Sequence, residues 1–178
     1  MTPPAYTHVC SLCRSSKGHL TVDDASVLSV PLCKHLTSLR VLGLHRDGYS
    51  GKSMVSLTEE QERALQLLTS LRQLNFYSYQ NLEFLPANLR SLDSLEELHI
   101  VRCPRILRLP EMGLPPSLKY LLLCGCSEEL CMQCRMAETE KLKVHFVFSV
   151  MVPIKLNGPG ANCSGFFGRY ATEGMDIL

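Results

Sequence analysis

The sequence predicts an α/β solenoid, in which short parallel strands line a concave face and irregular or helical segments return along a convex side. Leucine supplies the first observation: 31 of the 178 residues are Leu, and 28 of these precede residue 131. The second is a fixed spacing, L-x-x-L-x-x-L-x-L, which starts at Leu36, Leu68, Leu92 and Pro115. The starts lie 32, 24 and 23 residues apart. The last two intervals fit the roughly 20 to 29 residues of a leucine-rich repeat.

Each repeat ends in an alternation of apolar and variable positions, which is typical of a strand with one buried face. We therefore expect strands near 41–45, 73–77, 97–101 and 120–124, with a degenerate first strand near 20–22. The 32-residue interval contains SLTEEQERALQLL, where Thr58 and Gln61 fit a capping box. This segment predicts a helix near 58–68 on the convex side.

The leucine spacing also predicts how the chain divides. Residues 17–135 form the expected repeat domain, residues 1–16 are expected to be a poorly ordered N-terminal segment, and residues 136–178 form a non-repeat C-terminal tail. The solenoid is thus incomplete. One option for the apolar stretch 144–152 is a β-rich lid over the last repeat.

Charge and hydropathy exclude several classes of partner. The formal net charge is +1, from 18 basic and 17 acidic residues, so no global field attracts nucleic acid or an anionic membrane. The longest apolar stretch, 144–154, falls short of the ~20 residues of a membrane helix.

The first residues carry neither a basic region nor a continuous apolar run, so we expect a cytoplasmic protein. Most of the nine Cys are then expected to be buried thiols.

Ordered sequence blocks carry a family resemblance. The runs LTVDDASVL, LTSLRVLGL, SLTEEQERALQLLTSLRQLNF and NLEFLPANLRSLDSLEELHI resemble the C-terminal repeats of plant nucleotide-binding leucine-rich-repeat (NBS-LRR) disease-resistance proteins, the cereal members above all. The resemblance covers about residues 17–135. It implies part of an intracellular immune receptor, whose repeats recognise pathogen effectors or guarded host proteins and hold a switch domain inactive. The family's nucleotide-binding and coiled-coil regions are absent from this sequence, so the chain is not expected to run an ATP/ADP switch by itself.

Two motifs offer alternative chemistry. The fragment 48–53, GYSGKS, resembles a phosphate-binding loop, but Arg46 stands where that motif needs its outer glycine. An exposed loop is the favoured interpretation.

The second motif is a cysteine cluster. Four Cys lie within eleven residues, at 124, 126, 131 and 134, and another C-x-x-C follows His8. The Cys-x-Cys spacing is unusual for zinc, and Cys126 occupies the same repeat position as Cys103. None of the six His lies in a known catalytic motif. We therefore expect no enzyme activity, no cofactor and no metal site.

Strand alternation predicts the functional surface, because the residues between the buried leucines face outward on the concave side. A mixed array of this kind suits protein recognition, with two tyrosines and two arginines as plausible anchors. We predict a non-catalytic module that binds a protein: an effector, a host protein or a receptor's switch domain, but no nucleic acid and no membrane. The alternatives are a truncated receptor fragment without independent activity, a zinc-stabilised domain and a degenerate nucleotide binder. The predicted partner-binding residues are Val41, His45, Arg72, Gln73, Asn75, Tyr77, Glu97, His99, Val101, Arg102, Tyr120 and Leu122.

Overall fold

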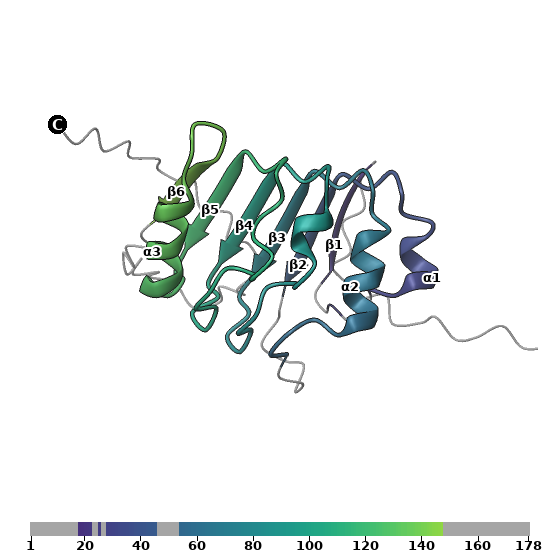
Figure 1. Cartoon of the computed structure of the whole chain (residues 1–178). Coiled ribbons are helices and arrows are strands. Elements are labelled where there is room, and N and C mark those ends of the chain that lie inside the picture. The colour runs from purple at the N-terminus through teal and green to yellow at the C-terminus, as the bar shows by residue number, and fades with distance from the viewer. Residues whose placement is uncertain (1–17, 23–24, 26–27, 46–53, 148–178) are drawn as a thin grey trace, which may run out of the picture.

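The protein is an α/β structure with one open sheet of six parallel strands, which follow one another in sequence order (Figure 1). The computed structural model describes residues 18–22, 25, 28–45 and 54–147. This arrangement is compatible with a solenoid. The strands are β1 (His19–Val22), β2 (Val41–His45), β3 (Gln73–Tyr77), β4 (Glu97–Val101), β5 (Tyr120–Cys124) and β6 (Lys143–Val147).

Three α-helices lie on one face of this sheet (Figure 1). They are α1 (Val30–Cys33), α2 (Glu59–Gln66) and α3 (Glu128–Ala137), and a 3-10 helix, η2 (Leu89–Ser91), lies between β3 and β4. The helix predicted near 58–68 is α2, and its capping box is present: Thr58 Oγ1 accepts from the Gln61 N–H, and Gln61 Oε1 accepts from the Thr58 N–H.

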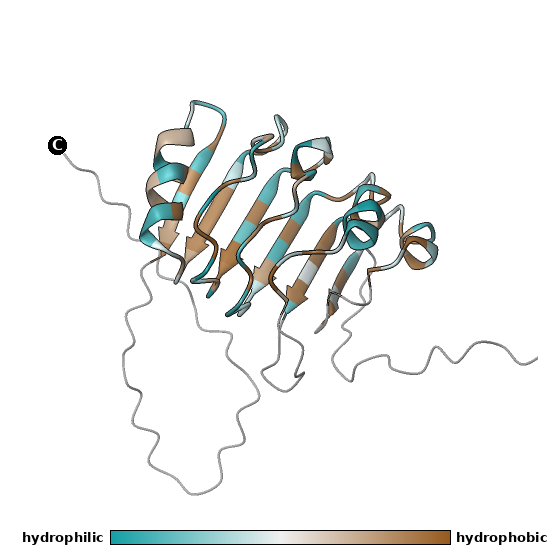
Figure 2. Ribbon diagram, turned by 60° about the horizontal axis from the view of Figure 1, so that its bottom comes forward, coloured by the Kyte–Doolittle hydropathy of each residue, from teal (hydrophilic) through white to brown (hydrophobic). Residues whose placement is uncertain are grey.

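The predicted strand alternation is confirmed by the register, which pairs equivalent residues of each strand with the next. One core row runs through Leu20, Leu42, Leu74, Leu98, Leu121 and Val144, and a second through Val22, Leu44, Phe76, Ile100, Leu123 and Phe146. In β2 to β5 these side chains are at most 1% exposed. Figure 2 shows the matching bands of apolar and polar residues along the strands. The core therefore lies between the sheet and the helices.

Polar side chains join each strand connection to the next. Ser94 Oγ donates to the Thr69 carbonyl at 2.7 Å, and Ser117 Oγ donates to the Leu95 carbonyl at 2.7 Å. Cys103 Sγ donates to the Phe76 carbonyl at 3.8 Å, and Cys126 Sγ donates to the Ile100 carbonyl at 3.2 Å. These small side chains thus bond to backbone oxygens of the preceding repeat.

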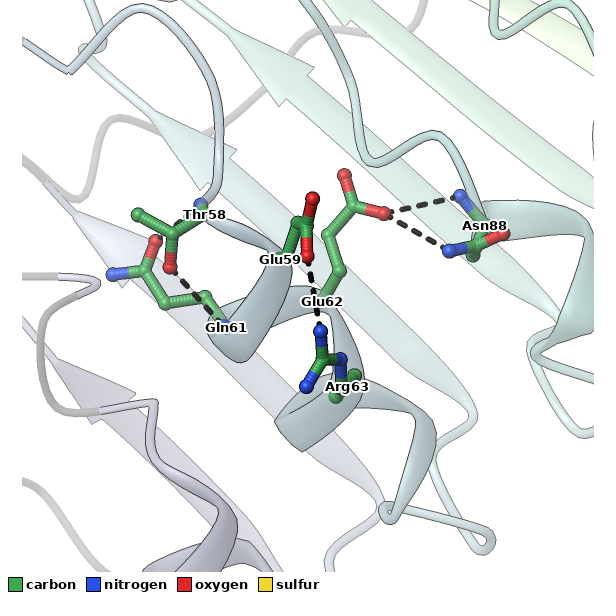
Figure 3. A network of polar contacts seen from close by, with 6 residues as sticks. All are labelled: Thr58, Glu59, Gln61, Glu62, Arg63 and Asn88. Atoms are coloured by element: carbon green, nitrogen blue, oxygen red, sulfur yellow. Dashed lines mark hydrogen bonds and ion pairs between the residues drawn. The ribbon is translucent and has the colours of Figure 1, made fainter.

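The helix α2 fills the longest connection and contacts the connections on both sides of it; Figure 3 shows its contact with Asn88 in the following one. Gln61 Nε2 donates to the Ala25 carbonyl at 2.9 Å in the preceding connection. In the following connection, the Glu62 carboxylate accepts from the N–H groups of Ala87 at 3.0 Å and Asn88 at 3.4 Å. The longer connection thus adds a helix and cross-links without interrupting the sheet.

The sheet continues past residue 135, where the sequence predicts a non-repeat tail. The helix α3 extends to Ala137, and β6 pairs in parallel with β5. Lys143 lies 23 residues after its partner Tyr120, so the spacing is retained. The leucine template fails here because its first two slots are the charged residues Glu138 and Lys141, whereas Val144 and Phe146 still pack on the core.

Three equivalent residues end β3, β4 and β5 in the left-handed conformation. Ser78 has φ 62°, Arg102 has φ 56° and Gly125 has φ 61°. The Ser78 N–H donates to the Val101 carbonyl at 2.8 Å, and the Arg102 N–H donates to the Cys124 carbonyl at 2.7 Å. The same turn therefore closes three consecutive strands.

Some expectations fall outside the described residues: the segment 1–16, the fragment 48–53 and the stretch 148–178. Within the described ranges, no helix combines the length and apolar character that crossing a membrane requires.

Candidate partner-binding surface

The sheet face opposite the helices, here called the open face, presents three rows of side chains, and no helix among the described residues covers it (Figure 1). In the register, the residues at the first, third and fifth strand positions of β2 to β5 align across the sheet. The first row is His19, Val41, Gln73, Glu97, Tyr120 and Lys143; the second is Thr21, Gly43, Asn75, His99, Leu122 and His145; the third is His45, Tyr77, Val101, Cys124 and Val147.

Four of the predicted residues form a hydrogen-bonded group at the centre of this face, here called the polar cluster: Gln73, Asn75, Glu97 and His99. Gln73 Nε2 donates to Asn75 Oδ1 at 3.0 Å and lies 3.4 Å from His99 Nδ1. His99 Nε2 lies 3.5 Å from Glu97 Oε2. The contacts cross from β3 to β4, so they fix the side chains of two neighbouring strands in one arrangement.

Burial sets the charge state within the polar cluster. Desolvation of the imidazole lowers the pKa of His99, and the carboxylate of Glu97 opposes this shift more weakly. His99 is therefore held towards its neutral form, in which it presents one donor and one acceptor.

A second group of side chains lies on the last two strands, here called the β5–β6 shelf: Tyr120, Leu122, Lys143 and His145. Tyr120 pairs with Lys143 and Leu122 with His145, and the rings of Tyr120 and His145 have centroids 6.3 Å apart. Tyr120 is 47% exposed and Leu122 is half-buried. A partner would therefore meet an aromatic and aliphatic surface beside two basic side chains.

At the carboxyl ends of β2 and β3, the His45 and Tyr77 rings lie with centroids 6.2 Å apart. Both residues are half-buried, as are Val41 and Gln73. These predicted residues lie together on the open face.

Two predicted residues offer the open face little surface. Asn75 is 4% exposed, because Gln73 lies over its amide oxygen and it stands in the crowded second row beside Gly43. Val101 is 8% exposed between Tyr77 and Cys124. Both support their neighbours instead of presenting atoms to a partner.

The two predicted arginines lie at opposite ends of the strands. Arg72 precedes β3, and its carbonyl accepts from the Glu97 N–H at 2.9 Å. Arg102 follows β4 in the left-handed turn, and its charge lowers the pKa of Cys124 against the larger effect of burial. Both are exposed, so they frame the open face without lying in its rows.

Sequence reasoning missed Lys143 and His145, which belong to the same rows as Tyr120 and Leu122. The alternation in KVHFV and its 23-residue distance from YLLLC are the signals that indicate them.

The cysteines do not assemble a metal site in the part of the chain that the structure describes, where no group of three or more His, Cys, Asp or Glu is placed to hold an ion. Burial raises the pKa of Cys103 to about 12, of Cys126 to about 11 and of Cys134 to about 12. Thiols with a raised pKa are poor ligands and poor nucleophiles near neutral pH. The zinc alternative therefore finds no support in these residues.

Comparison of the chain with protein-family models, with curated proteins and with solved structures finds no significant match.

Proposed function

We propose that this chain is a non-catalytic protein-recognition module of the leucine-rich-repeat type, which binds a protein partner through its open face. The observation that carries the proposal is the strand register, which places equivalent residues of every strand in continuous rows on a sheet face without helices. Surfaces of this kind distribute contacts over many strands, so a partner is recognised by an array of side chains.

The composition of the open face supports a protein partner. It combines Tyr77, Tyr120 and Leu122 with polar side chains whose geometry is fixed by hydrogen bonds. Aromatic residues are enriched in protein interfaces, where they bury large areas at low cost in conformational entropy. The resemblance to the distal repeats of plant NBS-LRR receptors indicates the setting: a cytoplasmic immune receptor that senses an effector or a guarded host protein.

A comparison of two triple variants tests the proposal. The open-face variant Tyr77→Ala/His99→Ala/Tyr120→Ala removes the predicted anchors. The matched control Phe84→Ala/Met112→Ala/Met132→Ala removes three side chains that are 58%, 65% and 53% exposed outside the sheet. Each tagged protein is used to recover partners from pathogen-challenged plant tissue, and each recovered partner is then purified and titrated. Circular dichroism establishes that both variants are folded.

We expect the open-face variant to bind an identified partner at least about tenfold more weakly, which is about 1.4 kcal/mol and in the range of one lost anchor. The control is expected to match the unaltered chain. Equal affinity of the two variants for every purified partner would contradict the proposal.

A further inference from the structure

The charges around the open face are divided unevenly between the two sides of the sheet. Four residues directly precede β2 to β5 and form a row at the strand starts, here called the entry row: Arg40, Arg72, Glu96 and Lys119. Successive members are joined through the backbone, since each N–H of Arg72, Glu96 and Lys119 donates to the carbonyl of the preceding member at 2.8 Å. Parallel strands lie ~4.8 Å apart, so the backbone positions of successive members are close to one another.

Only part of this positive charge is neutralised. Lys119 Nζ lies 2.9 Å from Glu96 Oε1, and this hydrogen bond lowers the pKa of Glu96. Within the described residues, neither Arg40 nor Arg72 forms an ion pair, and both are exposed. The charge of Arg72 also lowers the pKa of Glu96, so Glu96 offsets part of that charge, whereas Arg40 has no acidic residue beside it in the entry row. Lys143 extends the positive charge on to the β5–β6 shelf, beside Tyr120.

The helical side carries the opposite charge at its helix starts. The first turn of α2 holds Glu59, Glu60 and Glu62, and that of α3 holds Glu128 and Glu129. The entry row is thus mostly basic and the first turns of α2 and α3 are acidic, although the helical side also carries exposed basic residues such as Lys34 and Arg63. The basic residues of the entry row favour the approach of an anionic partner to the strand starts of the open face.

We propose that the partner segment bound by the open face is an acidic stretch of protein: its carboxylates pair with Arg40 and Arg72, and an apolar side chain packs on the β5–β6 shelf. This inference rests on the proposed function and names the chemistry of its partner. Arginine forks match carboxylates with two hydrogen bonds, and an exposed tyrosine beside leucine suits an apolar anchor. Glu97 lies within the rows, and the shelf is apolar at Tyr120 and Leu122, so a protein fits better than a nucleic acid backbone.

Three fluorescent probes test this in the full chain: a peptide of about ten residues with alternating Glu and Leu, the same peptide with Lys in place of Glu, and a single-stranded DNA of about ten nucleotides. We expect the Glu/Leu peptide to bind at least about tenfold more tightly than either other probe. Its affinity should fall about threefold to tenfold between about 0.05 M and about 0.3 M salt, because exposed charges are screened.

The variants separate charge from apolar contact. Arg40→Glu/Arg72→Glu is expected to lower the affinity for the Glu/Leu peptide about tenfold. Tyr120→Ala is expected to lower this affinity about threefold and to leave its salt dependence unchanged. Lys34→Glu/Arg108→Glu is the matched control, because it makes the same change in net charge at two exposed residues away from the open face. It should leave affinity within about twofold.

Equal binding of the Glu/Leu and Lys/Leu peptides, including no binding of either, would overturn the inference. DNA binding that equals the Glu/Leu peptide and ignores Tyr120→Ala would overturn it in favour of a nucleic acid partner. The variant at Tyr77, His99 and Tyr120 could lose affinity for the purified partners while that affinity depends neither on salt nor on Arg40 and Arg72. This result would support the proposed function and overturn this inference alone.

Discussion

Burial in the open face lowers the pKa of His99, and this links the stability of the fold to pH. In the unfolded chain His99 takes up a proton near its ordinary pKa of 6.5. The folded chain takes it up only at a lower pH. Between these two values the unfolded state binds more protons, so acid favours unfolding. The stabilisation is fully present above pH 6.5 and is lost as the pH falls below it.

We therefore predict that replacing His99 by Gln flattens the pH dependence of stability. Gln keeps a polar side chain near Gln73 and Glu97 but does not titrate. Urea unfolding from about pH 5 to about pH 8 measures the free energy of unfolding. The exposed His35→Gln serves as the control and should follow the unaltered chain. The prediction fails if the His99→Gln curve has the same slope as the control.

At the same scale, the sequence predicted which residues face outward but not how much each is exposed. Alternation identified the row of Gly43, Asn75 and His99 correctly. The burial of Asn75 depends on neighbours from other strands and on the hydrogen bond from Gln73. Such neighbours come together only in the register, so the 2-residue period cannot predict them.

Among the elements, α2 contacts both the preceding and the following connection, and Figure 3 shows the following contact, from Glu62 to Asn88. The Glu62 carboxylate receives two backbone N–H groups just before η2, and the Asn88 side-chain amide also donates to it at 3.3 Å. Ala87 and Asn88 both precede η2, which begins at Leu89. Glu62 therefore satisfies backbone N–H groups of the segment that leads into η2.

Replacing Glu62 by Ala is expected to destabilise the protein by about 1 kcal/mol, in the range of lost hydrogen bonds at a partly exposed site. Glu60→Ala is the matched control, since Glu60 is an exposed residue of the same helix and the same charge. The comparison is made by urea unfolding at neutral pH. Equal losses in the two variants would show that helix charge, not the contact to Ala87 and Asn88, is responsible.

The helix α2 itself was predictable because its start is encoded locally by Thr58 and Gln61. The helix α3 was not predicted, although Ser127 caps it by accepting from the Leu130 N–H at 3.2 Å. Two of its apolar positions, Cys131 and Cys134, belong to the cysteine cluster, so the sequence presents this segment first as candidate metal ligands and not as a helix.

At the scale of the whole molecule, β6 is the last strand of the sheet among the described residues. Its core residues Val144 and Phe146 are only half-buried, whereas their counterparts in β5 are at most 1% exposed. No further strand pairs with β6 among the described residues. The guanidinium of Arg135 in α3 lies 4.8 Å from the centroid of the Phe146 ring. A cation over the aromatic face thus covers part of this half-buried side chain.

Phe146→Ala should therefore destabilise the chain by about 2 kcal/mol, less than the ~3 to 5 kcal/mol of a fully buried phenylalanine. His145→Ala changes the adjacent, exposed side chain on the open face and should cost less than about 0.5 kcal/mol. Thermal and urea unfolding measure both. If Phe146→Ala is as mild as the control, β6 contributes little to the stability of the sheet.

The sixth strand also shows the limit of a spacing argument at this scale. The strands β2, β3 and β4 are predictable because both of their leading slots are leucine, and β5 because Leu118 fills one of them. Glu138 and Lys141 occupy both leading slots of β6, and both side chains are exposed. Charged residues are tolerated at such exposed positions, so the leucine template alone does not find this strand.

The interleaving of core and open-face residues along every strand has a consequence for how such a chain can change over generations. A substitution at Gln73, Glu97 or Tyr120 changes the surface of the open face and leaves the core residues Leu74, Leu98 and Leu121 in place. Under the proposed function, binding specificity and folding are therefore encoded by alternate residues of the same short segments. A combinatorial library built on these strands would then vary the proposed binding surface while it keeps the same core.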